Sequence, residues 1–265
     1  MSHIVAIDAG GTNLRVARVD TETHAISQRR QIATPTGGDE VLRACQELVR
    51  SVADGHTTAI GIGVPELVDQ DGKVASAANW DWRETDLESA FDAIAPTQVV
   101  SDVWAAALAE ATLGAGRGCD SFFYVSIGTG ISSTLVIHGR PWAGHTGRAI
   151  LLGAPLVESI ASGRAIAKVT GLPSAEDAFA DRAAQGAITK AADALGLELA
   201  RAVHLLDPER VVLGGGLGMD ARYRELISAA LRRQIDSTYA APPTIVAADL
   251  GDDAGLLGAA LAVAR

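Results

Sequence analysis

The chain of 265 residues is long enough for one large domain or two modest ones, and its 48% hydrophobic and 20% charged residues are typical of a soluble α/β protein. The net charge of −10 excludes the basic footprint of a nucleic-acid-binding protein. The two cysteines, Cys45 and Cys119, form neither a disulfide framework nor a zinc site and suit a reducing cytoplasm. We find no signal peptide and no apolar run of the roughly 20 residues that span a membrane. We therefore expect a cytoplasmic globular protein without nucleic-acid or membrane partners.

The first part of the chain predicts mainly strands. Apolar patterns indicate strands over 3–8, 14–20, 28–33, a buried stretch through Ile60 and Ile62, and 97–101. Helices are expected over 39–53, and over 104–113 before Gly114. The first two strands are joined by Asp8-Ala9-Gly10-Gly11-Thr12, which places a carboxylate and several backbone N–H groups at one hairpin tip.

The second part of the chain repeats this pattern of two strands joined by a glycine-rich tip. A strand over 121–127 breaks at Gly128-Thr129-Gly130 and resumes over 134–137. A duplicated half is the simplest account, although two such hairpins also arise by chance. Helices over 155–169 and 187–206, strands over 211–213 and 244–247, and an apolar helix over 254–264 follow. No low-complexity linker divides the chain, so the boundary is expected between packed elements near 102–120.

The first hairpin tip suits a nucleotide phosphate. Glycine permits positive φ and lets backbone N–H groups approach a ligand, and consecutive N–H groups bind anions. Thr12 adds a hydroxyl, and Asp8 is placed to hold a divalent cation through water. A plain glycine-rich hairpin with a capping aspartate is the alternative. The second tip has the same chemistry without the acid, and two such tips together suit a polyphosphate.

Two further features bear on chemistry. Gly214-Gly215-Gly216 follows a strand and would let an adenine or ribose lie against the backbone; the alternative is a helix-starting turn that needs small residues. It is no Walker A loop, and no GxGxxG follows the first strand. Asp102 stands where a buried strand meets a helix, so it is either an ordinary cap or a candidate base for a substrate hydroxyl.

These residues resemble those of the ROK family of sugar kinases and repressors. The resemblance rests on IDAGGTNLR, GIGVPELVD, Asn79-Trp80-Asp81-Trp82, VVSDVWAAALAE, SIGTGI, VESIASGRAI, DPERVVLGGGLG and GDDAGLLGAAL, in family order over nearly the whole chain. It implies a two-domain α/β actin-like ATPase (ribonuclease H-like) fold with an interdomain cleft. We expect one domain over 1–102, completed by the helix within 250–265, and a larger domain over 103–249.

The resemblance also assigns roles to residues. It implies that the first phosphate loop comprises Asp8, Gly10, Gly11, Thr12 and Asn13, with Mg²⁺ near Asp8, and the second Gly128, Thr129 and Gly130. Gly214 and Gly215 would lie against the adenosine of ATP. Asp102 matches the catalytic aspartate, and Asn79 and Glu158 match positions that contact sugar hydroxyls.

Three departures affect the sugar side. The residue before the catalytic aspartate is Ser101 instead of the family's asparagine. In the stretch where the family has AGEIGH, His145 replaces the glutamate and Arg148 replaces a zinc-binding histidine. The cysteine-rich loop that should follow is absent, so a tetrahedral zinc site cannot be built.

The leading interpretation is an ATP- and Mg²⁺-dependent kinase that phosphorylates a hydroxyl of a sugar-like acceptor, with Asp102 as general base. An amino sugar or cyclitol fits the changed pocket better than glucose does, although a hexose stays possible. The alternatives are a non-catalytic sugar or nucleotide sensor and a repressor, which would need a helix-turn-helix before Asp8. The sequence leaves the acceptor, the hydroxyl that is phosphorylated and the oligomeric state open, with a homodimer as one candidate.

Overall fold

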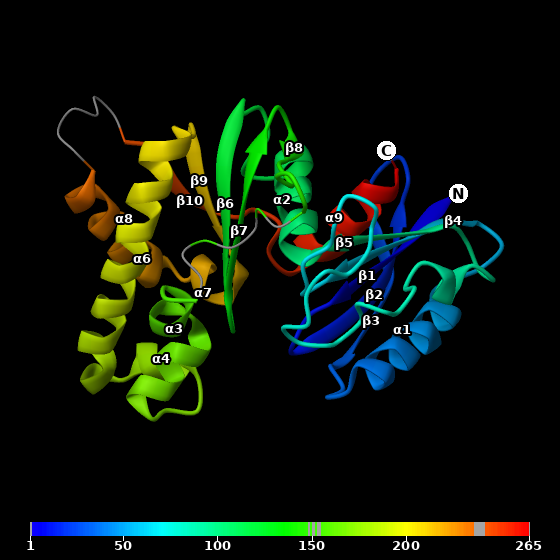
Figure 1. Cartoon of the computed structure of the whole chain (residues 1–265), viewed down its shortest axis with the longest axis horizontal. Coiled ribbons are helices and arrows are strands. Elements are labelled where there is room, and N and C mark those ends of the chain that lie inside the picture. The colour runs from blue at the N-terminus through cyan, green and yellow to red at the C-terminus, as the bar shows by residue number, and fades with distance from the viewer. Residues whose placement is uncertain (1, 148, 150–151, 153–154, 236–241, 265) are drawn as a thin grey trace. The chain divides into compact units, whose positions relative to one another are not determined.

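The computed structural model describes residues 2–147, 149, 152, 155–235 and 242–264. The chain divides into two compact units (Figure 1). The first comprises Met1–Thr112, Pro141–Ile150 and Asp252–Arg265, and the second Leu113–Arg140 and Leu151–Gly251. The expected boundary at 102/103 therefore falls earlier than the division in the structure, which keeps nearly all of helix α2 (Asp102–Leu113) with the first unit.

The sheet of the first unit has the order β3-β2-β1-β4-β5. Its strands are β1 (His3–Ala9), β2 (Asn13–Asp20), β3 (Ile26–Ala33), β4 (Thr57–Val64) and β5 (Thr97–Ser101). β1 and β2 form an antiparallel hairpin, while β1, β4 and β5 run parallel. The carboxyl ends of these three parallel strands therefore meet at one edge of the sheet.

Helices α1 (Gly38–Val52) and α9 (Ala254–Val263) cover opposite faces of this sheet (Figure 1). Val5 and Ile7 of β1 belong to the core with α1, and the alternation of the strand turns Asp8 to the other face, toward α9. Glycines let α9 approach closely, because a Cβ at Gly258 would lie 1.8 Å from the carbonyl oxygen of Ala105. The C-terminal helix thus packs within the first unit.

The sheet of the second unit has the order β10-β9-β6-β7-β8. Its strands are β6 (Ser121–Ile127), β7 (Ile131–Ile137), β8 (Arg140–Pro141), β9 (Arg210–Gly214) and β10 (Thr244–Ala247). β6 and β7 form an antiparallel hairpin, and β6, β9 and β10 run parallel. This repeats the topology of the first unit, as the duplicated sequence pattern predicts.

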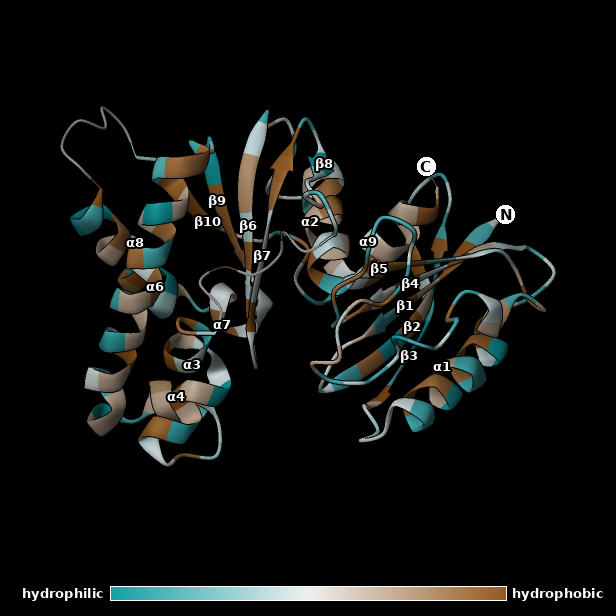
Figure 2. Cartoon of the chain, viewed as in Figure 1, coloured by the Kyte–Doolittle hydropathy of each residue, from teal (hydrophilic) through white to brown (hydrophobic). Residues whose placement is uncertain are grey.

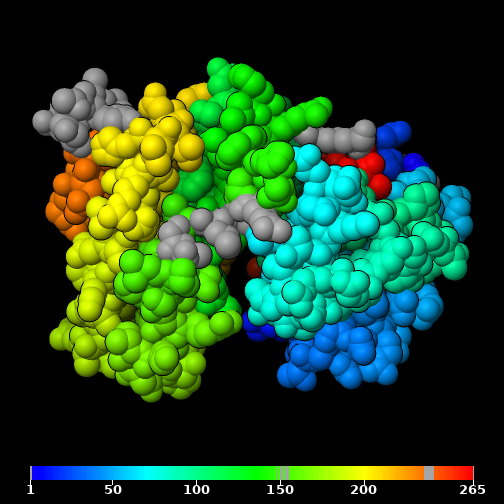
Figure 3. Space-filling view, in the orientation of Figure 1, coloured from blue at the N-terminus to red at the C-terminus, as the bar shows by residue number. Residues whose placement is uncertain are grey.

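The second unit carries the larger set of helices: α3 (Glu158–Ala161), α4 (Gly163–Thr170), α5 (Ala175–Ala180), α6 (Gln185–Leu206), α7 (Gly215–Met219) and α8 (Ala221–Gln234). Short 3₁₀ turns lie at Ser89–Phe91, Arg182–Ala184 and Gly251–Asp253. The apolar sides of α6 and α8 build the core with the sheet, whereas their polar sides face solvent (Figure 2). In the space-filling view α6 lies at the surface, in yellow (Figure 3).

The elements agree with the sequence patterns in most places. Helices α5 and α8 were not predicted, and one predicted helix is divided in the structure. The continuous helix expected over 155–169 is two helices, because Ser162 has an extended backbone and caps α4 by accepting a hydrogen bond from the N–H of Ala165. None of the helices in the described part of the chain is long and apolar enough to cross a membrane.

Candidate active site

Two aspartates of the first unit stand at the carboxyl edge of its sheet. Asp8, the penultimate residue of β1, lies opposite Gly63 of β4, and Ser101 of β5 lies opposite Val64 of the same strand. Asp102 follows Ser101 directly and begins α2. A Cβ built at Gly63 would lie 3.7 Å from the Cα of Asp102, so a small residue separates the two acidic positions.

The first hairpin tip is a tight turn. The N–H of Gly10 donates to the carbonyl oxygen of Asn13 at 3.1 Å, and the hydroxyl of Thr34 donates to the carbonyl oxygen of Gly10 at 2.6 Å. The N–H of Thr34 also donates to the carbonyl oxygen of Thr12 at 3.0 Å. The segment after β3 therefore holds the tip in place.

The glycines of both tips do not use the positive φ that glycine permits. Gly10, Gly11, Gly128 and Gly130 all lie outside that region. What the structure shows is open space: a Cβ at Gly11 would have Asn79 Oδ1, 3.7 Å away, as its nearest atom, and one at Gly128 would meet nothing within 4 Å. A ligand can approach the bare backbone at both positions.

Asp8 has a partner that the sequence analysis missed. Arg15 Nη1 donates to Asp8 Oδ2 at 3.1 Å, and both side chains are largely buried. Burial raises the pKa of Asp8, and the guanidinium of Arg15 opposes this effect. The signal was available, because Asp8 and Arg15 are cross-strand partners in the register of the β1–β2 hairpin.

Asp102 does not have the geometry of an ordinary N-cap. Its Oδ1 accepts a hydrogen bond from the N–H of Val103, the next residue, at 2.6 Å, whereas a capping side chain binds an N–H two or three positions further along. Burial and the negative charges of Asp8 and Glu66 raise the pKa of Asp102 to about 7. A carboxyl group with this pKa can exchange a proton near neutral pH.

In the second unit, Gly128-Thr129-Gly130 joins β6 to β7 and is held by hydrogen bonds to residues of α3 and α4. The N–H of Gly163, at the start of α4, donates to the carbonyl oxygen of Gly128 at 2.8 Å. Glu158 Oε2 accepts a hydrogen bond from the N–H of Ile131 at 2.9 Å and would lie 3.0 Å from a Cβ at Gly130. Glu158, expected to contact sugar, therefore also supports this tip.

Glycine is required at 214 and 215 by the packing of the protein, because a side chain at either position would collide with neighbouring protein atoms. A Cβ at Gly214 would lie 2.2 Å from the hydroxyl of Tyr124, and Gly215 has φ of 74° and would place a Cβ 2.5 Å from the carbonyl oxygen of Ile127. A Cβ at Gly216 meets nothing within 4 Å. The geometry at the first two glycines matches the helix-starting turn, and Gly216 is the glycine of the three with open space.

Of the residues expected to bind the acceptor, Asn79 lies beside the first hairpin tip, whereas the structure does not join His145 to it. Asn79 is exposed and lies beside Gly11, as its distance from a Cβ there shows. His145 is exposed, and Gln70 Nε2 donates to its carbonyl oxygen at 3.3 Å. Arg148 lies outside the described residues. None of the hydrogen bonds or ion pairs of the described residues joins His145 to Asn79 or Asp102.

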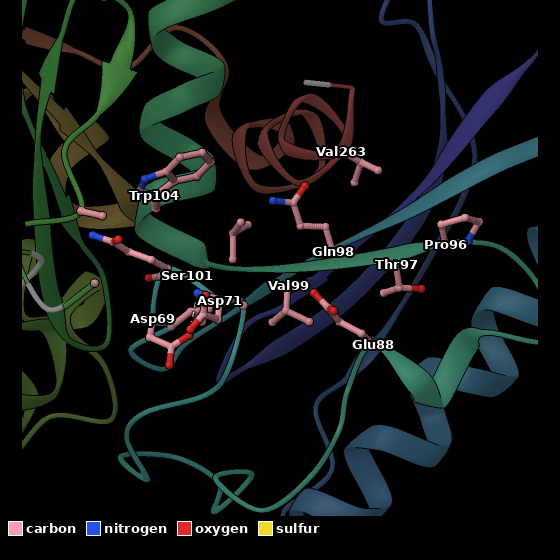
Figure 4. A pocket seen from close by; sticks show the side chains of 16 residues that line it. Asp69, Asp71, Glu88, Pro96, Thr97, Gln98, Val99, Ser101, Trp104 and Val263 are labelled. Carbon is pink, nitrogen blue, oxygen red and sulfur yellow. Dashed lines mark hydrogen bonds between the residues drawn. The ribbon is translucent and has the colours of Figure 1, made fainter. Parts of the chain in front are cut away.

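A groove of about 510 Å³ in the first unit runs along β5, the edge strand of the sheet (Figure 4). Trp104 and Gln98 lie on one side of the strand, and Val99 and Glu88 on the other (Figure 4). Among the expected site residues that the structure describes, Ser101 alone lines this groove, and Asp8 does not.

We predict that the purified protein contains no stoichiometric zinc. The cysteine-rich loop is missing from the sequence, and the described residues hold no group of three or more histidine, cysteine or acidic side chains that could bind a metal ion. Elemental analysis should find far less than one zinc per chain, and a chelator should leave the circular dichroism spectrum unchanged. One zinc per chain would contradict this reading of the sequence.

Two α/β units with repeated topology, each with a glycine hairpin tip at the carboxyl edge of its sheet, define an actin-like ATPase fold. The chain belongs to the ROK family, whose profile matches residues 4–265. The fold agrees with that of a ROK family glucokinase from Streptomyces griseus solved with glucose and AMPPNP, with a TM-score of 0.87, 27% identity, and coverage of 98% of this chain and 99% of that one. The predicted family and fold class are thereby confirmed.

Two curated relatives extend the comparison. A glucokinase of Thermotoga maritima is 28% identical over 97% of this chain and 96% of its own length. An N-acetylmannosamine kinase of Yersinia pestis is 30% identical over 97% of each chain. Both alignments cover nearly the full length of this chain and of the relative.

Proposed function

We propose that this protein is an ATP-dependent kinase that transfers the γ-phosphate to a hydroxyl group of a sugar-like acceptor. The class of enzyme is borne out by the full-length relatives, which are carbohydrate kinases. The observation that carries the proposal is geometric: Asp8 near the end of β1 and Asp102 directly after β5 lie on either side of β4 at one edge of the sheet, and Gly11 leaves open space beside Asn79.

ATP binding is assigned to the two glycine tips. Gly10, Gly11, Thr12 and Asn13 of one tip, and Gly128, Thr129 and Gly130 of the other, would donate to phosphate oxygens. The open space at Gly11 and Gly128 fits this role. We keep Gly214 and Gly215 as the support of the adenosine, on the family resemblance, although in this structure both face protein atoms.

Mg²⁺ is assigned to Asp8. Arg15 occupies Oδ2 of this carboxylate, which leaves Oδ1 as the oxygen that would hold the ion or one of its waters. When bound, Mg²⁺ would neutralise phosphate charge that develops during transfer. The carboxylate fits the oxygen chemistry that Mg²⁺ prefers.

Asp102 is the proposed general base. Its carboxylate would accept the proton of the acceptor hydroxyl while that oxygen attacks the γ-phosphate. Its pKa of about 7 supports this role, since the group is substantially ionised at neutral pH and basic enough to take a proton. Asn79, Ser101, His145, Arg148 and Glu158 are proposed to orient the acceptor, which we infer to be an amino sugar, a cyclitol or a hexose.

A coupled assay of ADP release tests the proposal. Glucose, N-acetylmannosamine, other amino sugars and cyclitols would each be added with ATP and Mg²⁺. Acceptor-dependent ADP release is expected with at least one compound. Binding of ATP and a sugar without turnover would instead identify the non-catalytic sensor. We place the enzyme in the cytoplasm, without nucleic acid, and a homodimer remains a candidate assembly.

His145→Glu is expected to shift acceptor preference toward glucose. Glutamate only accepts hydrogen bonds, whereas imidazole can also donate to a substrate oxygen. We expect turnover of the native acceptor to fall and the ratio of kcat/KM values to move toward glucose by roughly 1–3 kcal/mol, the scale of one buried polar contact. Steady-state kinetics with both acceptors measure this ratio.

His56→Glu is the matched control, because His56 is also exposed in the first unit and belongs to no proposed site. An unchanged ratio in the His145 variant, with both rates intact, would place His145 outside the acceptor pocket.

A further inference from the structure

Glu66 is a buried carboxylate that the sequence analysis did not single out. It follows β4 by two residues and is 2% exposed. It accepts four hydrogen bonds from one segment: from the hydroxyl of Ser76, and from the N–H groups of Ala78 at 2.8 Å, Asn79 at 2.5 Å and Trp80 at 3.0 Å. This segment is neither helix nor strand, so its backbone N–H groups have no partners within secondary structure. The carboxylate of Glu66 accepts their hydrogen bonds instead.

Both oxygens of Glu66 are needed. Oε1 accepts from Asn79 and Trp80, and Oε2 accepts from Ser76 and Ala78. A carboxamide has only one accepting oxygen, and its NH₂ group would face a donor on the other side. The ionised carboxylate is therefore the side chain that matches this set of donors.

The residues that follow Asn79 are also held in place. Trp82 Nε1 donates to the carbonyl oxygen of Gly38 at 3.2 Å, and the rings of Trp80 and Trp82 lie 4.8 Å apart. Both tryptophans are buried in the core with α1. The residues on either side of Asn79 thus leave its backbone little freedom.

The side chain of Asn79 has a defined orientation. Its Nδ2 donates to the carbonyl oxygen of Pro65 at 2.9 Å, and because a carbonyl can only accept, the amide nitrogen must be the atom on that side. Oδ1 is the atom next to Gly11, 3.7 Å from a Cβ built there. Asn79 therefore presents a hydrogen-bond acceptor beside the first phosphate tip.

We propose that Glu66 is a positioning residue for the acceptor substrate, which holds the loop so that Asn79 Oδ1 accepts a hydrogen bond from a substrate hydroxyl or amide N–H. The inference rests on the proposed kinase function and deepens it, because it adds a residue and states that the substrate group at Asn79 is a donor.

Glu66→Gln tests the proposal with little change in volume. With glucose or N-acetylmannosamine, whichever is phosphorylated, the KM of the sugar should rise about tenfold or more, the effect of losing a hydrogen bond to a charged group. The KM of ATP should stay within about twofold, because the tip itself is held by Thr34. Equal changes for both substrates, or none, would overturn the proposal.

Asp86→Asn is the matched control. Asp86 also accepts two hydrogen bonds, from the N–H of Ser89 at 3.1 Å and from its hydroxyl at 2.7 Å, and its partner Ser89 begins the 3₁₀ turn Ser89–Phe91, outside residues 76–80. Its sugar KM should equal that of the wild type. If Glu66→Gln does not fold, Ser76→Ala removes one of the four bonds and should raise the sugar KM by a smaller factor, while an unchanged KM would count against the proposal.

Hydrogen exchange gives a readout that does not depend on turnover. The amides of Ala78, Asn79 and Trp80 should be protected in the wild type and exchange about tenfold faster or more in Glu66→Gln. Free exchange in the wild type would overturn the positioning role. If no sugar is phosphorylated, the proposed activity fails by itself, and sugar affinity measured by calorimetry replaces KM in the comparison.

Discussion

Asp102→Asn is expected to lower kcat by about 10²–10⁴-fold, the usual contribution of a general base. Asparagine keeps the size of aspartate, and its Oδ1 can still accept the hydrogen bond from Val103. What it loses is basicity, so the acceptor hydroxyl would keep its proton as its oxygen attacks phosphorus. ATP affinity should change little, because among the hydrogen bonds of the described residues none joins Asp102 to Gly10, Gly11, Thr12 or Asn13. Calorimetry for ATP and steady-state kinetics separate the two effects.

A true helix cap in the second unit provides the control. Asp220 Oδ1 accepts hydrogen bonds from the N–H groups of Arg222 at 2.9 Å and Tyr223 at 3.1 Å, as an N-cap does. Asp220→Asn should leave kcat unchanged. If Asp102→Asn behaves like this control, with nearly full activity, Asp102 is structural and another group must act as base.

The pH dependence of the wild type adds a check on the same residue. Burial, together with the charges of Asp8 and Glu66, raises the pKa of Asp102 to about 7, and only the ionised form can accept a proton. The value of kcat/KM should therefore fall as the pH drops below about 7. The residual activity of Asp102→Asn should lack this acidic limb.

Much of the fold could be predicted because the sequence patterns are strong where the strands are buried. The strands over Thr97–Ser101 and Ser121–Ile127 were predicted at the bounds that the structure has. Helix α8 was not predicted, although its buried residues Tyr223, Ile227, Ala230 and Leu231 have the spacing of one helix face. The break at Ser162 depends on a single cap, which an apolar period does not reveal.

The candidate site could be predicted only in part. Motifs led to the tips and to Asp102, because glycine and acid at strand ends are visible in the sequence. Glu66 could not be found this way, since three of its four partners are backbone N–H groups of residues 78–80, which nearly any sequence would offer. The role of Gly214 and Gly215 could not be predicted either. Only the structure shows that a Cβ at these positions would collide with Tyr124 and Ile127.

Gly11→Val and Gly128→Val are each expected to weaken ATP binding by about 100-fold or more, which equals the loss of one or two hydrogen bonds to a charged phosphate. Neither glycine has positive φ, and a Cβ at either position makes at most an ordinary contact within the protein. The fold should therefore tolerate the first side-chain atom at both positions, and the loss should come from the space that the phosphates need.

Gly55→Val is the control for both variants. Gly55 is exposed, a Cβ there meets nothing within 4 Å, and it lies in the turn between α1 and β4, away from either tip. Calorimetric titration with ATP and Mg²⁺ should give wild-type affinity for Gly55→Val, and thermal unfolding should show that all three variants are folded. The two tip variants lie in different units, so a loss in only one would mean that a single tip holds the phosphates. Wild-type ATP affinity in both variants would show that neither tip binds the phosphates, because a valine side chain leaves no room for a phosphate against the backbone.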